Sequence, residues 1–153
     1  MFNLYKAGLE SHEEGKKLRI VEFLRVDSKG RVTIPRTVRE ALNIIEGGYV
    51  IMIADLNKNE IVLTPGGGGA GKVMELRINF KDVKGKLAEI SEKLVDMGID
   101  QISTNCRTIK KGEEAECLLI VEIPENLEPE DVEKRLLDIE GIKEVLLLPI
   151  PGH

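Results

Sequence analysis

The chain has 153 residues, enough for one ordinary domain or two small ones. Its net charge of −5 argues against a generally basic nucleic-acid coat protein. The sequence has no run of 18 apolar residues that could cross a bilayer, and residues 1–17 lack the apolar stretch of a secretory signal, so a cytoplasmic location is expected.

The charge is distributed unevenly along the chain. Residues 1–65 contain 10 basic and 9 acidic residues, whereas residues 66–153 contain 12 and 18. Between Lys16 and Glu40, eight basic residues stand against three acidic ones, a local net charge of +5. Lysine and arginine neutralise phosphates and release counterions, so this segment is a candidate nucleic-acid contact, with a merely solvated charged face as the alternative.

Residues 1–17 are expected to form an N-terminal tail, followed by a small domain over residues 18–65. LRIVEFLRV at 18–26 predicts a strand, DSKG supplies turn residues, and RVTI at 31–34 resumes the extended pattern. The sequence therefore predicts a hairpin at the start of this domain.

A short helix is predicted after Pro35, with Thr33 as a candidate cap and apolar residues at helical spacing. Gly47 and Gly48 end it, and a second hairpin follows with strands at 49–55 and 60–65 around the turn NKN. Four short strands and one helix give little material for a core, so pairing with a second copy of the chain is expected.

At this point the residues resemble a known family. The stretch VDSKGRVTIPRTVREALNIIEGGYVIMI is similar to the SpoVT/AbrB swapped-hairpin domain of bacterial transition-state regulators and MazE-type antitoxins. The shared features are Asp, Gly-Arg, an alternating apolar pair, Ile-Pro and a short Arg-containing helix. The resemblance implies a mostly-β, intertwined homodimer that binds double-stranded DNA through basic hairpins and short helices.

The same resemblance indicates which residues contact DNA. Arg31 and Arg39 match DNA-contacting arginines of the family by position, and Arg25 matches a basic position in the first strand. Leu24 and Glu40 depart from the pattern, because the best-known regulator has arginines there. With two added basic neighbours, the DNA-binding candidates are Arg25, Lys29, Arg31, Arg36 and Arg39.

The stretch PGGGGAGKV at 65–73 fits the first seven positions of the phosphate-binding pattern G-x-x-x-x-G-K-[ST]. Val73 replaces the hydroxyl residue that would bind magnesium, and the alternating pattern that follows predicts a strand where a nucleotide site needs a helix. Residues 66–72 are therefore interpreted as a glycine-rich linker between two domains.

The second domain, residues 73–150, has a clear order of elements. Strands are predicted over 73–80, 99–110, 116–123 and 142–150, and helices over 86–98 and from Pro129 to Gly141. The apolar stripe of the first helix contains Leu87, Ile90, Leu94 and Met97. The order β-α-β-β-α-β is that of the α+β ferredoxin-like fold, with two helices on one face of an antiparallel sheet.

Lys111 and Gly112 are predicted to form a two-residue turn between adjacent strands. Residue numbers that face each other then sum to 223, which pairs Arg107 with Glu116, Lys110 with Glu113 and Cys106 with Cys117. The two cysteines have no C-x-x-C spacing, so neither a metal site nor a disulfide framework is indicated. In a reducing cytoplasm they are expected to be thiols, with a redox role as the minor alternative.

This domain is similar to the ACT domain, a small-molecule sensing module of amino-acid metabolism. The signature Asp-x-x-Gly-x-Leu-x-x-Ile is present as Asp82, Gly85, Leu87 and Ile90, followed by Gly-Ile-Asp at 98–100. The resemblance implies an amino-acid effector bound where the first strand-to-helix loop meets a neighbouring protomer. The ligand-binding candidates are Asp82, Val83, Gly85, Lys86, Leu87 and Asp100.

These acidic and glycine positions also have structural interpretations. Asp82 is a candidate helix cap, Gly85 a site of close backbone approach, and Asp100 the start of a strand. No catalytic set, metal cluster or cofactor motif is found in the sequence, so the chain is expected not to be an enzyme. The leading hypothesis is a DNA-binding, homo-oligomeric transcriptional regulator with a metabolite sensor. The alternative is an antitoxin-like interaction protein whose second domain only mediates oligomerisation.

Overall fold

The computed structural model of the protein describes residues 18–66 and 69–152. The expected N-terminal tail, residues 1–17, lies outside them. The chain divides into two compact units between Gly48 and Tyr49. No helix in the described ranges is long and apolar enough to cross a membrane.

The first unit contains the predicted chain reversal. The amide of Gly30 donates to the carbonyl of Asp27, and the amide of Asp27 donates to the carbonyl of Arg31, both at 3.0 Å. Gly30 has φ of +74°, a left-handed conformation that favours glycine. The predicted strands at 18–26 and 31–34 are wrong for the single chain, because no residue of the described segment 18–34 forms one. A strand needs a ladder of hydrogen bonds to a neighbour, and the two segments form none here.

The short helix α2 spans Arg36–Ala41 and is preceded by Pro35, whose φ of −58° suits the start of a helix. The prediction of a short helix after this proline is confirmed. Thr33 does not cap it, since the N-cap position is Pro35 and no side chain makes a capping hydrogen bond. No residue of α2 is fully buried.

Strands β1 (Val50–Asp55) and β2 (Glu60–Pro65) form an antiparallel two-stranded sheet, as the sequence predicts. Asp55 organises the turn, because its Oδ1 accepts hydrogen bonds from the amides of Asn57 and Lys58 at 3.0 and 3.1 Å. Asn59 completes the turn with φ of +53°.

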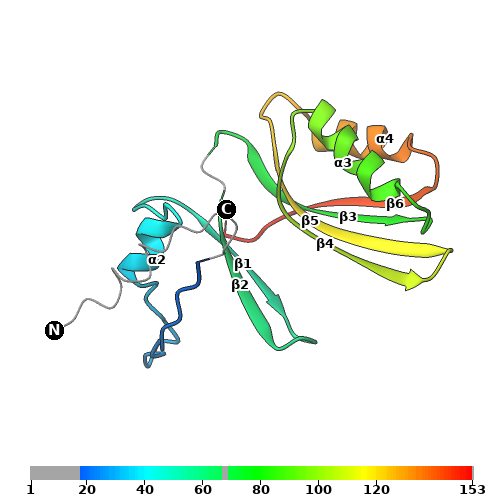
Figure 1. The fold of residues 1–153 in the computed structure, drawn as a ribbon. Helices are drawn as coiled ribbons and strands as arrows, with labels where there is room; N and C mark the ends of the chain where they lie inside the picture. Colours follow the sequence, from blue (N-terminus) through cyan, green and yellow to red (C-terminus); the bar gives the residue numbers. More distant parts are fainter. Residues whose placement is uncertain (1–17, 67–68, 153) are drawn as a thin grey trace. The chain divides into compact units, whose positions relative to one another are not determined.

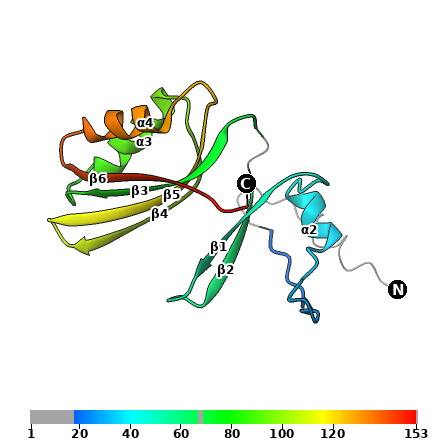
Figure 2. The same cartoon turned by 180° about the vertical axis from the view of Figure 1, so that it is seen from behind.

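The ferredoxin-like sheet, residues 72–149, follows. Its four strands have the spatial order β4-β5-β3-β6 and are all antiparallel. Helices α3 and α4 lie together on one face, as both views of the ribbon show (Figures 1 and 2). The predicted β-α-β-β-α-β fold is confirmed, with elements β3 (Lys72–Phe80), α3 (Lys86–Asp96), β4 (Asp100–Lys110), β5 (Glu114–Ile123), α4 (Pro129–Leu137) and β6 (Ile142–Pro149).

The core lies between this sheet and its two helices. Ile90 and Leu94 of α3 and Val132 and Leu136 of α4 are fully buried against alternate residues of β3 and β5. Each such side chain contributes about 1.5–3 kcal/mol of transfer free energy. Leu87 departs from the predicted stripe, because its side chain is 40% exposed.

The register of β4 and β5 agrees with two of the three predicted pairs. Arg107 faces Glu116 and Cys106 faces Cys117. The third pair is wrong, because an irregularity after Thr108 places Lys110 opposite Glu114. The turn consequently contains three residues, 111–113, instead of two.

The two cysteines are joined in a disulfide, with their Cα atoms 4.1 Å apart. The expectation of free thiols is therefore wrong for this structure. Direct cross-strand neighbours have the proximity that bond formation requires, and the sequence register had already placed the two residues opposite each other.

The C-terminal end of the glycine-rich segment packs closely against the end of strand β5. Lys72, assigned to the linker from the sequence, is the first residue of β3 and pairs with Ile123. A Cβ atom at Gly71 would lie 2.4 Å from the carbonyl oxygen of Ile123, so only glycine fits there. At Gly69 the corresponding contact is 2.3 Å to the end of the Glu122 side chain, which can move.

We expect Gly71→Ala to destabilise the ferredoxin-like unit, because the added methyl group would push β3 away from the end of β5. Overpacking of this kind costs roughly 1–3 kcal/mol. Thermal unfolding followed by circular dichroism measures the loss. Gly69→Ala is the matched control and should change Tm little; equal effects of the two substitutions would contradict the packing argument.

Candidate functional site

The turn of the first unit is organised by Asp27. Its Oδ1 accepts hydrogen bonds from the amides of Lys29 and Arg31 at 2.8 and 2.9 Å, and its Oδ2 lies 2.7 Å from Nε of Arg31. These hydrogen bonds, first that from the Arg31 amide and then that from the Arg31 guanidinium, hold the pKa of Asp27 below its usual value. One carboxylate therefore fixes both the backbone of the turn and the direction of the Arg31 side chain.

Two arginines of α2 have different surroundings. Arg36 pairs with Glu40 one turn later at 2.7 Å, and both side chains are exposed. Arg39 is half-buried and donates from Nη1 to the carbonyl oxygen of Ile34 at 2.7 Å. Arg39 thus ties the helix to the segment before it, a structural role that the sequence did not indicate.

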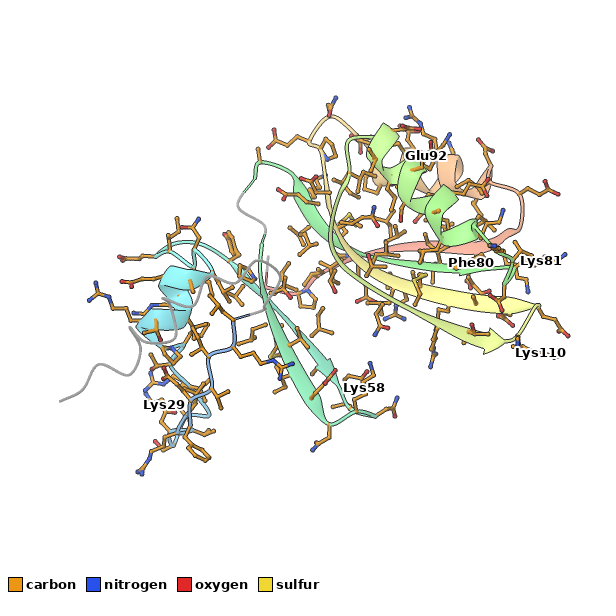
Figure 3. All side chains as sticks on the ribbon, in the orientation of Figure 1. Lys29, Lys58, Phe80, Lys81, Glu92 and Lys110 are labelled. Atoms are coloured by element: carbon orange, nitrogen blue, oxygen red, sulfur yellow. A yellow bond between two sulfur atoms is a disulfide. The ribbon has the colours of Figure 1, made fainter. Side chains whose placement is uncertain are left out.

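The predicted DNA-binding residues therefore fall into two groups. Arg25, Lys29, Arg31 and Arg36 are exposed, and Lys29 lies at the turn (Figure 3). Arg39 is partly withdrawn from solvent by its bond to the main chain. Exposed ion pairs such as those of Arg31 and Arg36 contribute little to stability, so a phosphate can replace their carboxylate partners.

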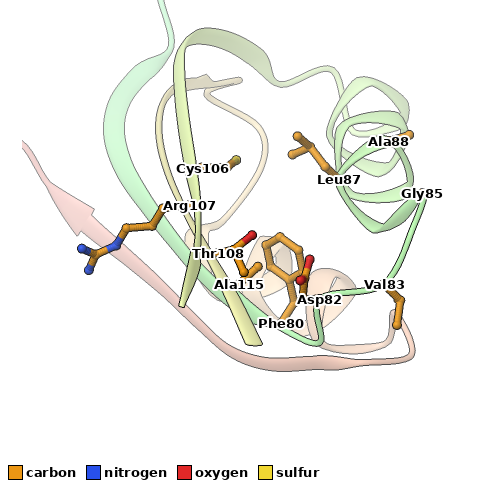
Figure 4. Close-up of a pocket in the computed structure, with 10 residues that line it drawn as sticks. All are labelled: Phe80, Asp82, Val83, Gly85, Leu87, Ala88, Cys106, Arg107, Thr108 and Ala115. Atoms are coloured by element: carbon orange, nitrogen blue, oxygen red, sulfur yellow. The ribbon is translucent and has the colours of Figure 1, made fainter. Parts of the chain in front are cut away.

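A second site lies in the ferredoxin-like unit. A cavity of about 520 Å³ opens beside strand β4, and we call it the edge cavity. Loop 82–85 and the first turn of α3 bound it on one side, and residues 106–108 of β4 bound it on the other (Figure 4). Phe80 and Ala115 lie at its base. Its volume lies in the range of small-molecule sites.

The edge cavity has a mostly apolar lining with few polar groups. Leu87 of α3 faces it, together with Cys106 and Thr108 of β4. Arg107 points away from it and forms an ion pair with Glu116 at 2.8 Å (Figure 4). Alternation along the strand explains this arrangement, because residues 106 and 108 share one face and residue 107 has the other.

Asp82 is the carboxylate of the edge cavity. Its Oδ2 accepts a hydrogen bond from the amide of Gly112 at 2.9 Å and so connects the loop before α3 to the β4–β5 turn. The helix-cap interpretation is wrong, since the N-cap of α3 is Gly85 and no side chain caps it. Gly85 has φ of +85° with open space around it, so backbone conformation, and not close approach, requires glycine there.

Four of the six predicted ligand-binding residues line the edge cavity: Asp82, Val83, Gly85 and Leu87. Lys86 does not. Its side chain is 10% exposed, and its Nζ donates to the carbonyl oxygen of Glu140 and to Glu89 at 2.8 Å. It therefore clamps the start of α3 to the turn before β6.

Asp100 also lies outside the edge cavity. It stands opposite Glu122 on β5, seven positions along that strand from Ala115, which lies opposite Thr108. Cys106, the cavity residue of β4 nearest to Asp100, lies opposite Cys117, five positions from Glu122, so at about 3.3 Å per residue Asp100 is roughly 17 Å from the cavity. The two acids of the sequence pattern are therefore not brought together within one chain.

Cys106 and Thr108 were not predicted to belong to the ligand site, although the predicted register of the two strands already placed them on one face of the sheet. A sum of 223 places Thr108 opposite Ala115 as well as Cys106 opposite Cys117, and the structure has both pairs. Among the described residues, no group of three or more His, Cys, Asp or Glu side chains is arranged to hold a metal ion.

Comparison with known proteins finds a family match in the first part of the chain. Residues 23–70 match the family described as antidote-toxin recognition MazE, bacterial antitoxin. This segment, the MazE-like segment, includes the Asp27 turn, α2 and the β1–β2 hairpin. Its match is in line with the resemblance that the sequence motif indicates.

A solved structure resembles the other part of the chain. It is the ACT domain from GTP pyrophosphokinase of Chlorobium tepidum, 15% identical, with a TM-score of 0.45 over 52% of this chain and all of that one. No curated protein matches the chain. Strand order and register by themselves define the ferredoxin-like fold of residues 72–149.

We expect the carboxyl group of Asp27 in the MazE-like segment to titrate below 3.8, its ordinary pKa. Because the folded-state pKa is lowered, the bonds to this carboxylate stabilise the turn above pH 3.8 and are lost as the pH falls through the folded-state value. Carbon-13 NMR of the side-chain carboxyl measures the titration. Arg31→Gln should raise the pKa only part of the way to 3.8, since the amide of residue 31 still donates; full recovery would contradict this assignment.

Proposed function

We propose that the protein is a DNA-binding transcriptional regulator whose ferredoxin-like unit senses an amino acid or related metabolite. The observation that supports this most directly is the Asp27 turn, which presents Lys29 and Arg31 on an exposed, ordered loop within the MazE-like segment. Exposed guanidinium and ammonium groups on a fixed backbone are suited to duplex phosphates. We assign the protein no enzymatic step.

The DNA-binding form is a homodimer in this proposal. The extended segment 18–34 exposes its apolar side chains in the single chain: Val21 is 89% exposed and Phe23 fully so. Exposed apolar residues of this density favour an interface, and unpaired extended backbone favours pairing with another strand. A second copy would cover both and would double the number of phosphate contacts.

The edge cavity supports the sensing role. Its volume suits an amino acid, its apolar lining suits a hydrophobic side chain, and the second carboxylate oxygen of Asp82 can accept from an ammonium group. Because Asp82 also holds the β4–β5 turn, a ligand that engages it would change how the edge strand is held. Such a change would bias how protomers pair and so how their DNA-binding segments are presented.

An antitoxin-like interaction protein is the second candidate, and the MazE match favours it. In that case the first domain would bind operator DNA and the ferredoxin-like unit would mediate oligomerisation or bind a protein partner. The family's antitoxins usually end in a disordered tail that wraps the toxin, whereas residues 72–149 here form a packed unit. We therefore place this candidate second.

Replacement of the exposed cations should weaken DNA binding. We expect Arg31→Gln with Arg36→Gln to reduce affinity for a duplex from the promoter of the protein's own gene at least tenfold. The slope of log affinity against log salt should fall from about −7, the value for eight phosphate contacts per dimer, to about −4. Fluorescence anisotropy measures both quantities.

Two variants sharpen this test. Lys134→Ala removes a positive charge from an exposed position of α4 and should leave binding unchanged. Glu40→Gln frees Arg36 from its ion pair and should tighten binding. Arg39 is avoided because its substitution would also loosen α2. Unchanged affinity and slope in the double variant would exclude this patch as the DNA contact.

A ligand of the edge cavity should raise the Tm of the protein. At a hundredfold excess over Kd the stabilisation is about 2.7 kcal/mol, which is several degrees for a domain of this size. A thermal-shift screen of the twenty amino acids tests this, with Asp82→Asn expected to abolish the shift. Asp96→Asn, the same change at an exposed position near the end of α3, is the control. A flat screen would favour the interaction protein over the sensor.

A further inference from the structure

The disulfide in the ferredoxin-like unit has two unequal ends. Cys117 belongs to the hydrophobic core and has no exposed surface. Cys106 is exposed on β4, the edge strand of the sheet, and lines the edge cavity. Figure 4 shows its side chain directed across the cavity towards α3. The Cys106 end of the bond therefore borders the cavity, whereas the Cys117 end is enclosed in the core.

This asymmetry distinguishes the bond from a purely stabilising disulfide in which both cysteines are buried. A small thiol can approach the Cys106 end of the bond through the edge cavity, whose base and walls, as formed by the described residues, are largely apolar. Arg107, the nearest charged neighbour in sequence, points to the opposite face of the sheet and is paired with Glu116. The carboxylate in the cavity lining, that of Asp82, already accepts a hydrogen bond from the amide of Gly112.

We propose that Cys106 and Cys117 form a reversible dithiol–disulfide couple in which Cys106 exchanges with small-molecule thiols and disulfides through the edge cavity. Cys117 is the resolving partner. The argument for this couple does not rest on the DNA-binding proposal or on the amino-acid effector proposed for the same cavity, because it depends only on the surroundings of the two cysteines.

Reduction of the protein disulfide takes two successive thiol–disulfide exchange steps. In reduction, a small thiolate attacks Sγ of Cys106, the protein S–S bond breaks, and Cys117 leaves as a thiolate that takes up a proton. A second thiolate then attacks the small-molecule sulfur of the mixed disulfide and releases Cys106. Two small thiols become one small disulfide, and the protein gains two electrons and two protons. Oxidation by a small disulfide is the reverse sequence.

Opening the bond changes how the edge strand is restrained. The disulfide closes a loop around the β4–β5 turn, with 11 residues of sequence separation between the cysteines. Without it, β4 is held to β5 by its backbone ladder on one side only, since β4 is at the edge. Reduction should therefore lower the Tm of the native protein by about 5–15 °C and loosen the side of the edge cavity that β4 forms.

The test uses the full chain in buffers of defined ratio of reduced to oxidised glutathione, with acid quenching, alkylation and mass spectrometry. Wild-type protein should pass reversibly between dithiol and disulfide as the ratio is changed, under conditions in which circular dichroism shows it folded. Peptide mapping of partly reduced wild type should find glutathione on Cys106 and not on Cys117. The mapping requires no variant, so it remains decisive if a substitution in the core prevents folding.

Two variants isolate the roles of the cysteines. Cys117→Ala should stop at one glutathione per chain on Cys106, because no resolving thiol remains. Cys106→Ser should react at least about 100-fold more slowly, since Cys117 becomes accessible only on local unfolding. The proposal is overturned if wild type stays oxidised at every ratio until it is denatured, or stays reduced at every ratio. Equal rates for the two variants would also overturn it.

Discussion

The antiparallel register between β4 and β5 is the constraint on which the second half of the molecule depends. It places Cys106 against Cys117 and Thr108 against Ala115, and it brings Gly112 within hydrogen-bonding distance of Asp82. A shift of one residue would turn both β4 side chains to the other face of the sheet. The cavity, its carboxylate and the sulfur pair therefore follow from a single backbone alignment, fixed by the buried alternate residues of β5.

In the first half of the molecule, by contrast, the backbone before α2 has no strand partner within one chain. Segment 18–34 reverses at the Asp27 turn but has no ladder, and it exposes residues such as Val21 and Phe23. An isolated two-stranded element is marginal in water, and so is a six-residue helix such as α2. In the homodimer proposed above, the stability of this half would therefore depend on protein concentration in a way that the stability of the packed ferredoxin-like unit does not.

Sequence patterns predicted most of the ferredoxin-like unit because strand alternation and helical stripes there are long and end at glycines. Gly98 and Gly141 have positive φ values where helix ends were expected. Individual roles were harder to predict. Arg39 was assigned to DNA by its position in the family motif and Lys86 to the ligand by its place at the start of a helix, whereas the side chain of each donates to a main-chain carbonyl. Such roles depend on which carbonyl lies within reach, and a pattern along the chain contains no information on that.

The acidic partners of the two exposed arginines have a consequence for selectivity. Asp27 and Glu40 already occupy the guanidinium groups of Arg31 and Arg36. A small anion that displaces one carboxylate replaces one weak ion pair with another, so its net binding free energy is small. A duplex offers many phosphates on a rigid spacing, so several exchanges occur in one encounter and their gains accumulate. In the DNA-binding protein proposed above, the two carboxylates would therefore make these arginines select a polyanion over free phosphate or sulfate.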